Sequence, residues 1–323
     1  MTLQVVPATD LEPTVKDKAT RRRNGRLRKR KNGLTRAGAA APWWFILPAL
    51  AFYTFAVLVP SARGLAYSFT DWNGLRPVLK FIGFDNYAKI FADEAAASSL
   101  VNTLFFALAV TILQNGIGLL LALGVHRLIK SRNILRVILF TPAVLTPVVT
   151  AYVWKFMFAP DGPINSTADS LGIAWLHQDW LGNPALAPWA IVMTIVWQFS
   201  GYSMVIFLAG LQGIPEEIYE ASAVDGAGSV RQFFAITRPL LAPAITVNLM
   251  LSIIGGLKLF DQIQVMTGGG PGNATVTLSG QIYKTGSEFG QYSYSIAMAV
   301  ILTIAVAFVS GIQYKLLARQ ENR

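Results

Sequence analysis

Apolar residues gather into blocks of about 20 along this chain, and polar connections containing glycine or proline separate the blocks. An α-helix rises about 1.5 Å per residue, so about 20 residues cross a hydrocarbon core about 30 Å thick. We therefore predict an all-α membrane protein with six transmembrane helices. The six apolar blocks are residues 43–59, 104–125, 135–158, 187–211, 243–266 and 293–316.

The overall composition favours lipid as the main solvent of the chain. Of the 323 residues, 53% are hydrophobic and only 14% are charged, and the mean hydropathy is +0.47. A soluble domain of this composition would expose large apolar surfaces to water. The polar stretch before the first block is too long for a signal-peptide n-region, and it lacks a small-residue cleavage site. We expect this block to be retained as a span, with Trp43 and Trp44 in an aromatic belt.

The formal net charge of +10 comes mainly from Lys and Arg residues that precede the first apolar block. No aromatic residues are interleaved among them, so they indicate the basic flank of a membrane helix and no nucleic-acid partner. We predict that residues 1–41 form a disordered cytoplasmic tail attracted to anionic membrane lipid, that 42–318 form the transmembrane domain, and that 319–323 form a cytoplasmic C-terminus. The basic residues of the tail are Lys16, Lys18, Arg21, Arg22, Arg23, Arg26, Arg28, Lys29, Arg30, Lys31 and Arg36.

The remaining basic residues predict the orientation. If the tail is cytoplasmic, the connections after the second and fourth blocks and the C-terminus are cytoplasmic too. These segments carry nine Lys and Arg residues, against six in the longer segments on the opposite side. Because Lys and Arg concentrate in cytoplasmic loops, we predict that both termini are cytoplasmic. The nine are Arg127, Lys130, Arg132, Arg136, Arg231, Arg238, Lys315, Arg319 and Arg323; the six are Arg63, Arg76, Lys80, Lys89, Lys155 and Lys284.

Residue types that perform catalysis or bind metals are scarce. The chain has no cysteine, which excludes disulfides, thiol catalysis and cysteine-ligated metals. Its two histidines, His126 and His177, are too scattered to suggest a metal site. The glycine-rich run at 268–272 lacks the spacing of a phosphate-binding loop, so we interpret it as a tight turn. We expect this chain to bind no metal and no cofactor.

The connection between the fourth and fifth blocks, about residues 215–243, carries the start and stop signals of a helix, a turn and a second helix. Pro215 suits the first helical position, and Glu216 and Glu217 suit the first turn, where the helix dipole favours anions. The run Asp-Gly-Ala-Gly at 225–228 is expected to break this helix. The sequence therefore predicts that a first short helix ends near Gly226.

The second helix of this connection is predicted to begin at Ser229. Gln232 follows three residues later and completes a capping-box pattern with Ser229. Pro239 and Pro243 are expected to stop the helix. These helix start and stop signals alone are equally compatible with a capped connector that has no role beyond joining two spans.

The same connection resembles the cytoplasmic EAA loop of ABC importer permeases, which has the pattern E-A-A, three residues, G, nine residues, I-x-L-P. Five residues match this pattern and two depart from it. The matches are Glu220, Ala221, Gly226, Ile236 and Pro239, and the departures are Ser222 for the second Ala and Arg238 for the Leu.

Three further segments resemble the sugar-type branch of these permeases, carbohydrate uptake family 1. They are LKLFDQIQVMTGGGPGNATVTL at 257–278, YSFTDWNG at 67–74 and FIGFDNYAKIF at 81–91. The resemblance covers about residues 42–318 and implies the fold of a type I importer permease in a bacterial cell membrane.

The resemblance also implies partners. In such importers the EAA loop inserts into a cleft on a cytoplasmic ATPase. It therefore implies two ATPase copies that bind the ATP and Mg²⁺, a second permease chain in a heterodimer, an external solute-binding protein and a sugar-class solute. The chain has no P-loop, so we expect no ATP hydrolysis by it and no enzymatic activity. The residues expected at the ATPase are Glu220, Ala221, Ser222, Asp225, Gly226, Ala227, Ile236 and Pro239.

Polar and aromatic residues inside the blocks are the candidates for a solute pathway, because buried polar groups need protein or water partners. Lys258 and Asp261 are three apart, so on a helix they would share a face and form either a structural ion pair or contacts to solute hydroxyls. Aromatic side chains offer stacking faces for a sugar ring, although such residues are more often packing or interfacial anchors. The candidates are Trp154, Trp197, Gln198, Tyr202, Asn248, Lys258, Asp261 and Gln264.

Two other function classes remain as alternatives. An ion-gradient-driven secondary transporter or channel would want intramembrane carboxylates, and Asp261 is the clear candidate for one. An intramembrane enzyme would want His, Cys or paired acids within the spans, which the blocks lack.

Overall fold

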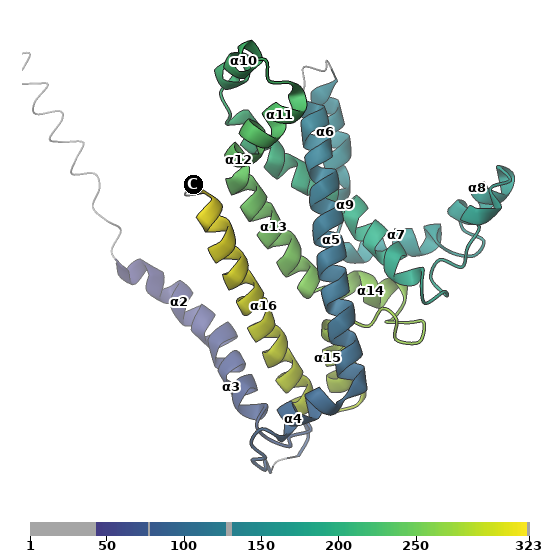
Figure 1. Cartoon of the computed structure of the whole chain (residues 1–323). Coiled ribbons are helices and arrows are strands. Elements are labelled where there is room, and N and C mark those ends of the chain that lie inside the picture. Colours follow the sequence, from purple (N-terminus) through teal and green to yellow (C-terminus); the bar gives the residue numbers. More distant parts are fainter. Residues whose placement is uncertain (1–42, 77, 127–130, 322–323) are drawn as a thin grey trace, which may run out of the picture. The chain divides into compact units, whose positions relative to one another are not determined.

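The computed structural model describes residues 43–76, 78–126 and 131–321 (Figure 1). The chain forms two compact units, Met1–Ala62 and Arg63–Arg323. The predicted basic tail, residues 1–41, lies outside the described residues.

The described residues are mostly helical, which confirms the predicted all-α class; their one β feature is an isolated antiparallel bridge between Thr70 and Phe81. The elements in chain order are η1 (Trp43–Ile46), α2 (Leu47–Tyr53), η2 (Thr54–Leu58), α3 (Val59–Tyr67), α4 (Asp85–Ala92), α5 (Glu94–His126), α6 (Arg132–Phe140), η3 (Thr141–Val144), α7 (Pro147–Met157), α8 (Pro163–Ser170), η4 (Ala174–Leu176), α9 (Ala187–Gln212), α10 (Glu216–Val224), α11 (Ser229–Gln232), η5 (Phe233–Thr237), α12 (Arg238–Leu240), α13 (Ala242–Leu257), α14 (Asp261–Met266), α15 (Leu278–Tyr283), η6 (Lys284–Glu288) and α16 (Tyr292–Glu321).

Four continuous helical stretches of the described chain are long and apolar enough to cross a membrane, and the number rises to six if each of two bent helix pairs counts as one span. The four are Trp44–Tyr67, Glu94–His126, Ala187–Gln212 and Tyr292–Lys315, which correspond to the first, second, fourth and sixth apolar blocks. The third and fifth blocks are not single straight helices.

The third block is broken at Leu145 and Thr146, where the helix pair Arg132–Val144 and Pro147–Met157 bends by 97°. Both residues are extended, with ψ of 144° and 147°. Pro147 explains the break, because it has no amide hydrogen and disfavours helical geometry in the residue before it. The Thr146 side chain then caps α7 by accepting a hydrogen bond from the Val149 amide at 3.4 Å.

The fifth block also ends earlier than predicted. Helix α13 stops at Leu257, and α14 begins only at Asp261, so residues 258–260 form a turn. The glycine pair at 255–256 weakens the helix just before this point. A second bend, of 71°, lies at the other end of α13, between Ser229–Leu240 and Ala242–Leu257.

Small residues let the central helices α5, α9 and α13 approach closely. A Cβ added at Gly118 of α5 would lie 2.5 Å from the Cβ of Ser203 in α9, and one at Gly256 of α13 would lie 2.6 Å from the Cα of Ala107 in α5. Such small-residue contacts are typical of membrane helix packing, where backbones meet without large side chains between them.

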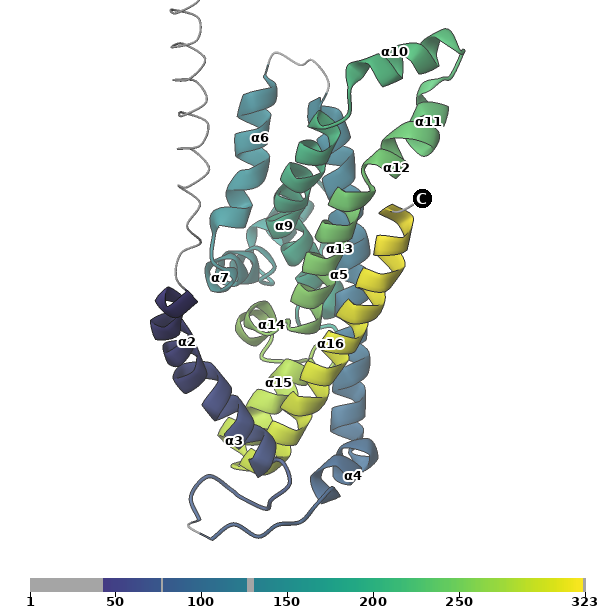
Figure 2. The same ribbon diagram turned by 90° about the vertical axis from the view of Figure 1, so that its left-hand side faces the viewer.

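The two ends of the Arg63–Arg323 unit differ in their structure. The hairpin of α10 to α12 and the C-terminal end of α16 lie at one end, and α4 lies at the other (Figures 1 and 2). At the α4 end, Asp93 caps α5 by accepting hydrogen bonds from the amides of Ala95 and Ala96, at 2.9 and 3.4 Å. A hydrogen bond from the Tyr294 hydroxyl, helped by these amides, holds the pKa of the Asp93 carboxyl below its usual value, although burial opposes the shift.

Candidate functional site: a helical hairpin and a transmembrane cavity

The predicted helix-turn-helix at 215–243 is present, with α10 as its first helix. Pro215 occupies the N-cap position with ψ of 136°, one residue before the position predicted for it. Glu216 and Glu217 lie in the first turn, as the sequence predicted. The added negative charge suits this end of a helix, where unpaired amides give a partial positive charge.

The turn after α10 depends on Gly226. Its φ is +76°, in the left-handed region that glycine adopts most easily. The Gly226 amide donates to the Ala223 carbonyl at 3.0 Å, and the Ala227 amide donates to the Ser222 carbonyl at 2.9 Å. This pair of bonds is a Schellman motif, which satisfies carbonyls left unpaired at a helix end. The predicted break at 225–228 is confirmed.

The predicted capping box of the second helix is wrong. Gly228, not Ser229, is the N-cap residue of α11. The Gln232 side chain does not reach back to the cap. Its Nε2 atom instead donates to the Ser222 hydroxyl of α10 at 2.9 Å and to the Tyr219 carbonyl at 3.4 Å. Gln232 therefore links the two helices of the hairpin, and Ser222, one of the two departures from the EAA pattern, supplies an acceptor that an alanine would lack.

A second hydroxyl contact closes the base of the hairpin. The Tyr219 hydroxyl lies 3.0 Å from Oγ1 of Thr237, which is buried. Among the residues expected at the ATPase, three are half-buried and the others are exposed. The half-buried ones are Ser222, Ala227 and Ile236, and the exposed ones are Glu220, Ala221, Asp225, Gly226 and Pro239.

The hairpin also exposes large apolar side chains. Val224 is 89% exposed, Val230 is 73% exposed and Phe234 is 60% exposed. These three residues lie on α10, α11 and η5, so both arms of the hairpin carry exposed apolar side chains.

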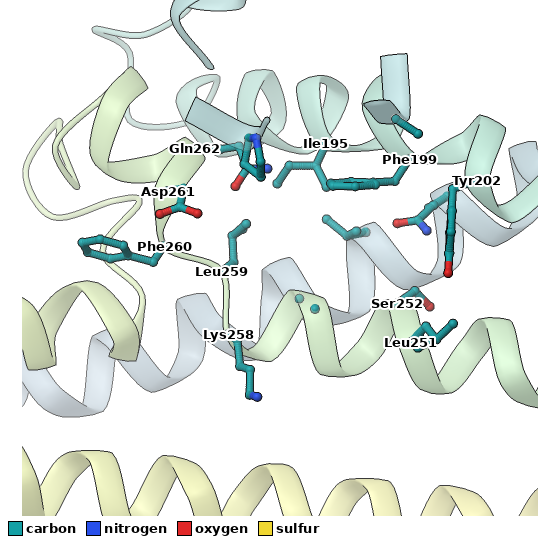
Figure 3. Close-up of a pocket in the computed structure, with 16 residues that line it drawn as sticks. Ile195, Phe199, Tyr202, Leu251, Ser252, Lys258, Leu259, Phe260, Asp261 and Gln262 are labelled. Carbon is teal, nitrogen blue, oxygen red and sulfur yellow. The ribbon is translucent and has the colours of Figure 1, made fainter. Parts of the chain in front are cut away.

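A cavity of about 410 Å³ lies among the central helices and the two helix breaks (Figure 3). Its wall combines polar groups, aromatic rings and backbone at the breaks. The lining residues are Val110 and Gln114 of α5; Ala143 and Pro147 beside the first break; Ile195, Phe199 and Tyr202 of α9; Leu251, Ser252, Gly255 and Gly256 of α13; and Lys258, Leu259, Phe260, Asp261 and Gln262 at the second break.

Three of the eight predicted pathway residues, Tyr202, Lys258 and Asp261, line this cavity. The predicted ion pair between Lys258 and Asp261 is absent, because the chain leaves the helix at Lys258 and the two residues no longer share a helical face. Figure 3 shows their side chains pointing in different directions. In the described part of the chain, the one contact within 4 Å between an acidic side chain and a Lys, Arg or His nitrogen joins Asp169 and His177.

Gln198 and Asn248 are fully buried and bond to protein groups instead of facing the cavity. Gln198 of α9 bonds to Leu145 in the first helix break and to Gln262 in α14, just after the second. Asn248 of α13 accepts a hydrogen bond from the Ser203 hydroxyl of α9 at 3.0 Å, and that hydroxyl accepts one from Gln114 of α5 at 2.9 Å. These bonds join the three central helices.

The other three candidates, Trp154, Trp197 and Gln264, also lie outside the cavity wall. Trp154 packs edge to face against Trp197, with ring centroids 5.5 Å apart, and against Phe158 at 5.2 Å. The aromatic pair therefore serves packing. Gln264 is half-buried on α14.

Phe199 and Phe260 are cavity residues that no sequence signal singled out. Phe199 lies three positions before Tyr202, so a helical periodicity search outward from Tyr202 would have found it. Phe260 reaches the cavity only because the chain turns at 258–260. The described residues contain no cluster of three or more His, Asp or Glu side chains that could hold a metal ion.

Long apolar helices, a mostly apolar cavity between them and an exposed hairpin are the features of an all-α membrane permease. Residues 114–322 match the family described as the binding-protein-dependent transport system inner membrane component, and the chain belongs to this family.

Two curated relatives and one solved structure illustrate the similarity. The probable starch degradation products transport system permease protein AmyD of Thermoanaerobacterium thermosulfurigenes is 37% identical over 280 residues, which cover 86% of this chain and 94% of the relative. The multiple sugar-binding transport system permease protein MsmF of Streptococcus mutans is 34% identical over 274 residues, with 85% and 94% covered. A chain of a bacterial alginate ABC transporter, solved in complex with its alginate pentasaccharide-bound periplasmic protein, matches with a TM-score of 0.76, 21% identity and 86% and 94% coverage, which shows the shared fold.

Proposed function

We propose that this chain is the translocating permease subunit of an ATP-driven importer, and that it moves a sugar or related solute that an external binding protein delivers. The similarity to AmyD over 94% of that relative carries the proposal, because AmyD is described as a permease for starch degradation products. MsmF, described as a multiple sugar-binding transport permease, supports the same solute class. The alginate transporter of the same fold was solved with its periplasmic protein, which supports an external binding protein as partner.

The cavity has the chemistry that a sugar needs. Tyr202 and Phe199 present aromatic rings that can cover the apolar face of a sugar ring. Gln114, Ser252 and Asp261 supply donors and acceptors for hydroxyl groups. A mostly apolar pocket with a few convergent polar groups is the usual form of a small-molecule site. The solute is held by side chains and leaves chemically unchanged.

In this proposal the hairpin of α10 to α12 docks on a partner ATPase, which binds the ATP and Mg²⁺. The exposed Val224, Val230 and Phe234 provide the apolar contact, and the residues of the EAA-like pattern form its centre. A short helical hairpin in a groove transmits displacement of the partner to the spans. A second permease chain completes the translocation path, and the assembly lies in a bacterial cell membrane with both termini on the cytoplasmic side.

The proposal is tested by breaking the hairpin without removing the chain from the membrane. Gly226→Pro demands a φ near −65° where Gly226 has +76°, so the turn cannot form. The matched control is Gly228→Pro, because Gly228 already has a φ of −70°. We expect Gly226→Pro to lower co-purification of the co-expressed ATPase and uptake of radiolabelled sugars at least tenfold, and the control to change both less than twofold.

Normal co-purification of the Gly226→Pro variant would contradict the coupling role. The sugar panel for uptake should contain maltose, maltotriose, lactose and raffinose, tested with the purified binding protein in proteoliposomes. Ion-gradient-driven uptake by the chain alone, without ATPase, would instead establish the rival secondary transporter.

A further inference from the structure

The two breaks in the helices, at 145–146 and at 258–260, lie on the same cavity although they are more than 100 residues apart in the chain. Ala143 and Pro147 bring the first break to the cavity wall, and residues from Lys258 to Gln262 bring the second. Helix breaks leave backbone groups without helical partners, and in a membrane each such group needs another partner. The side chains that bond to these unpaired backbone groups therefore determine how stable the backbone conformation is at each break.

One side chain, Gln198 of α9, bonds to the first break and to the first turn of α14, directly after the second break. Its Nε2 atom donates to the Leu145 carbonyl at 2.9 Å, and its Oε1 atom accepts from Nε2 of Gln262 at 3.3 Å. In an unbroken helix the Leu145 carbonyl would accept from the Val149 amide, but that amide bonds to the Thr146 hydroxyl instead. Gln198 therefore replaces a helical hydrogen bond that the break removed.

The segments beyond the two breaks are also joined to each other. The Lys155 ammonium group of α7 donates to the Val265 carbonyl of α14 at 3.0 Å. Ala151 of α7 and Ile263 and Met266 of α14 belong to one buried apolar cluster. Helices α7 and α14 thus form a single packed pair, and its connection to α9 at the breaks includes the Gln198 amide.

We propose that Gln198 is a positioning residue that fixes the two helix breaks against α9 and thereby sets the shape of the solute cavity, without touching the solute. Gln198 is 0% exposed, and both ends of its amide are occupied. Its helical neighbours Ile195, Phe199 and Tyr202 face the cavity instead. A buried amide with two satisfied bonds is costly to remove, because each partner is left unpaired.

The test is hydrogen exchange, followed by mass spectrometry, on the full chain in lipid nanodiscs. Gln198→Met keeps the length of the side chain and removes both bonds. We expect amide exchange to accelerate about tenfold at 145–150 and at 259–264, while the rest of α5 and α9 keeps its protection. The matched control is Thr194→Val, one turn earlier on α9, because the buried Thr194 hydroxyl bonds only to the Ala190 carbonyl of its own helix.

A second variant, Gln262→Met, removes only one of the two bonds. It is expected to accelerate exchange at 259–264 and to leave 145–150 unchanged. This variant decides the question if Gln198→Met does not fold. Uniform acceleration in Gln198→Met, or protection at both breaks equal to that of Thr194→Val, would overturn the proposal.

A transport measurement then separates positioning from general instability, and it rests on the proposed importer function. In the assembled importer, Gln198→Met is expected to raise the ATP hydrolysed per sugar transported about fivefold, while the ATPase rate stays within twofold. A general loss of folded protein would lower the rate of sugar transport and the rate of ATP hydrolysis together, and their ratio would stay the same. Because the exchange experiment needs no partner or solute, its result stands even if the importer function fails.

Discussion

Side-chain hydrogen bonds stabilise both the hairpin and the cavity, but the two regions differ in how far apart in the sequence the bonded residues are. In the hairpin, Gln232 bonds to Ser222 and Tyr219 contacts Thr237, at separations of 10 and 18 residues. Around the cavity, Gln198 bonds across 53 and 64 residues, and Asn115 bonds to Ser252 across 137. The hairpin is therefore held by local bonds, whereas the cavity is built by segments spread from Val110 to Gln262.

The two regions also differ in burial. Most of the hairpin residues are exposed, and Ser222 and Gln232, which bond to each other, are half-buried, so water replaces part of a hydrogen bond lost between them. Gln198 and Asn248 are fully buried, where a lost partner leaves an unsatisfied group. Substitutions of these buried groups should therefore loosen contacts between helices that are distant in the chain, whereas substitutions in the hairpin should leave those contacts unchanged and affect the coupling proposed for it.

The largest effect is expected at the contact between α6 and α9. A Cβ at Gly201 would overlap the Leu139 carbonyl of α6, and a backbone group cannot move aside as a flexible side chain can. We expect Gly201→Val to destabilise the chain by about 3 kcal/mol or more, seen as loss of monodisperse protein or a large drop in melting temperature in detergent. Gly255→Val is the control, because a Cβ at Gly255 meets nothing within 4 Å. Equal melting temperatures of the two variants would show that α6 does not pack against α9 as described.

A smaller effect is expected at the turn of the hairpin. Gly226→Ala places a Cβ in open space but at a φ of +76°, so strain of about 1 kcal/mol is the only penalty. We expect exchange at 221–227 to accelerate about fivefold, with an unchanged melting temperature of the whole chain. Gly228→Ala, in equally open space at a φ of −70°, should change neither quantity. A drop in global stability for Gly226→Ala would remove the distinction between a local hairpin and a distributed cavity.

The same difference in sequence separation between bonded residues explains which features could be predicted from the sequence. The break at Gly226 was correct, because a left-handed glycine after a short helix is a local signal. The pairing of Lys258 with Asp261 was wrong, because it assumed a helix that the chain leaves at Lys258. The role of Gln198 could not be predicted, because its two partners are 53 and 64 residues away and one of them is a backbone carbonyl.

The smallest effect is expected inside the hairpin, where Ser222 stands at the second Ala position of the EAA pattern. Ser222→Ala restores the family's usual residue and removes the hydroxyl that accepts from Gln232 at 2.9 Å. Because both groups are half-buried, water replaces part of the bond, and we expect a coupling energy of about 0.5–1 kcal/mol in a double-mutant cycle with Gln232→Met. The measurement is local exchange at 219–224, together with the ATPase rate of the proposed importer assembly. Additive effects of the two substitutions would mean that α10 and α11 are fixed by the Schellman turn alone, and the hairpin would then be a looser unit than its hydrogen bonds indicate.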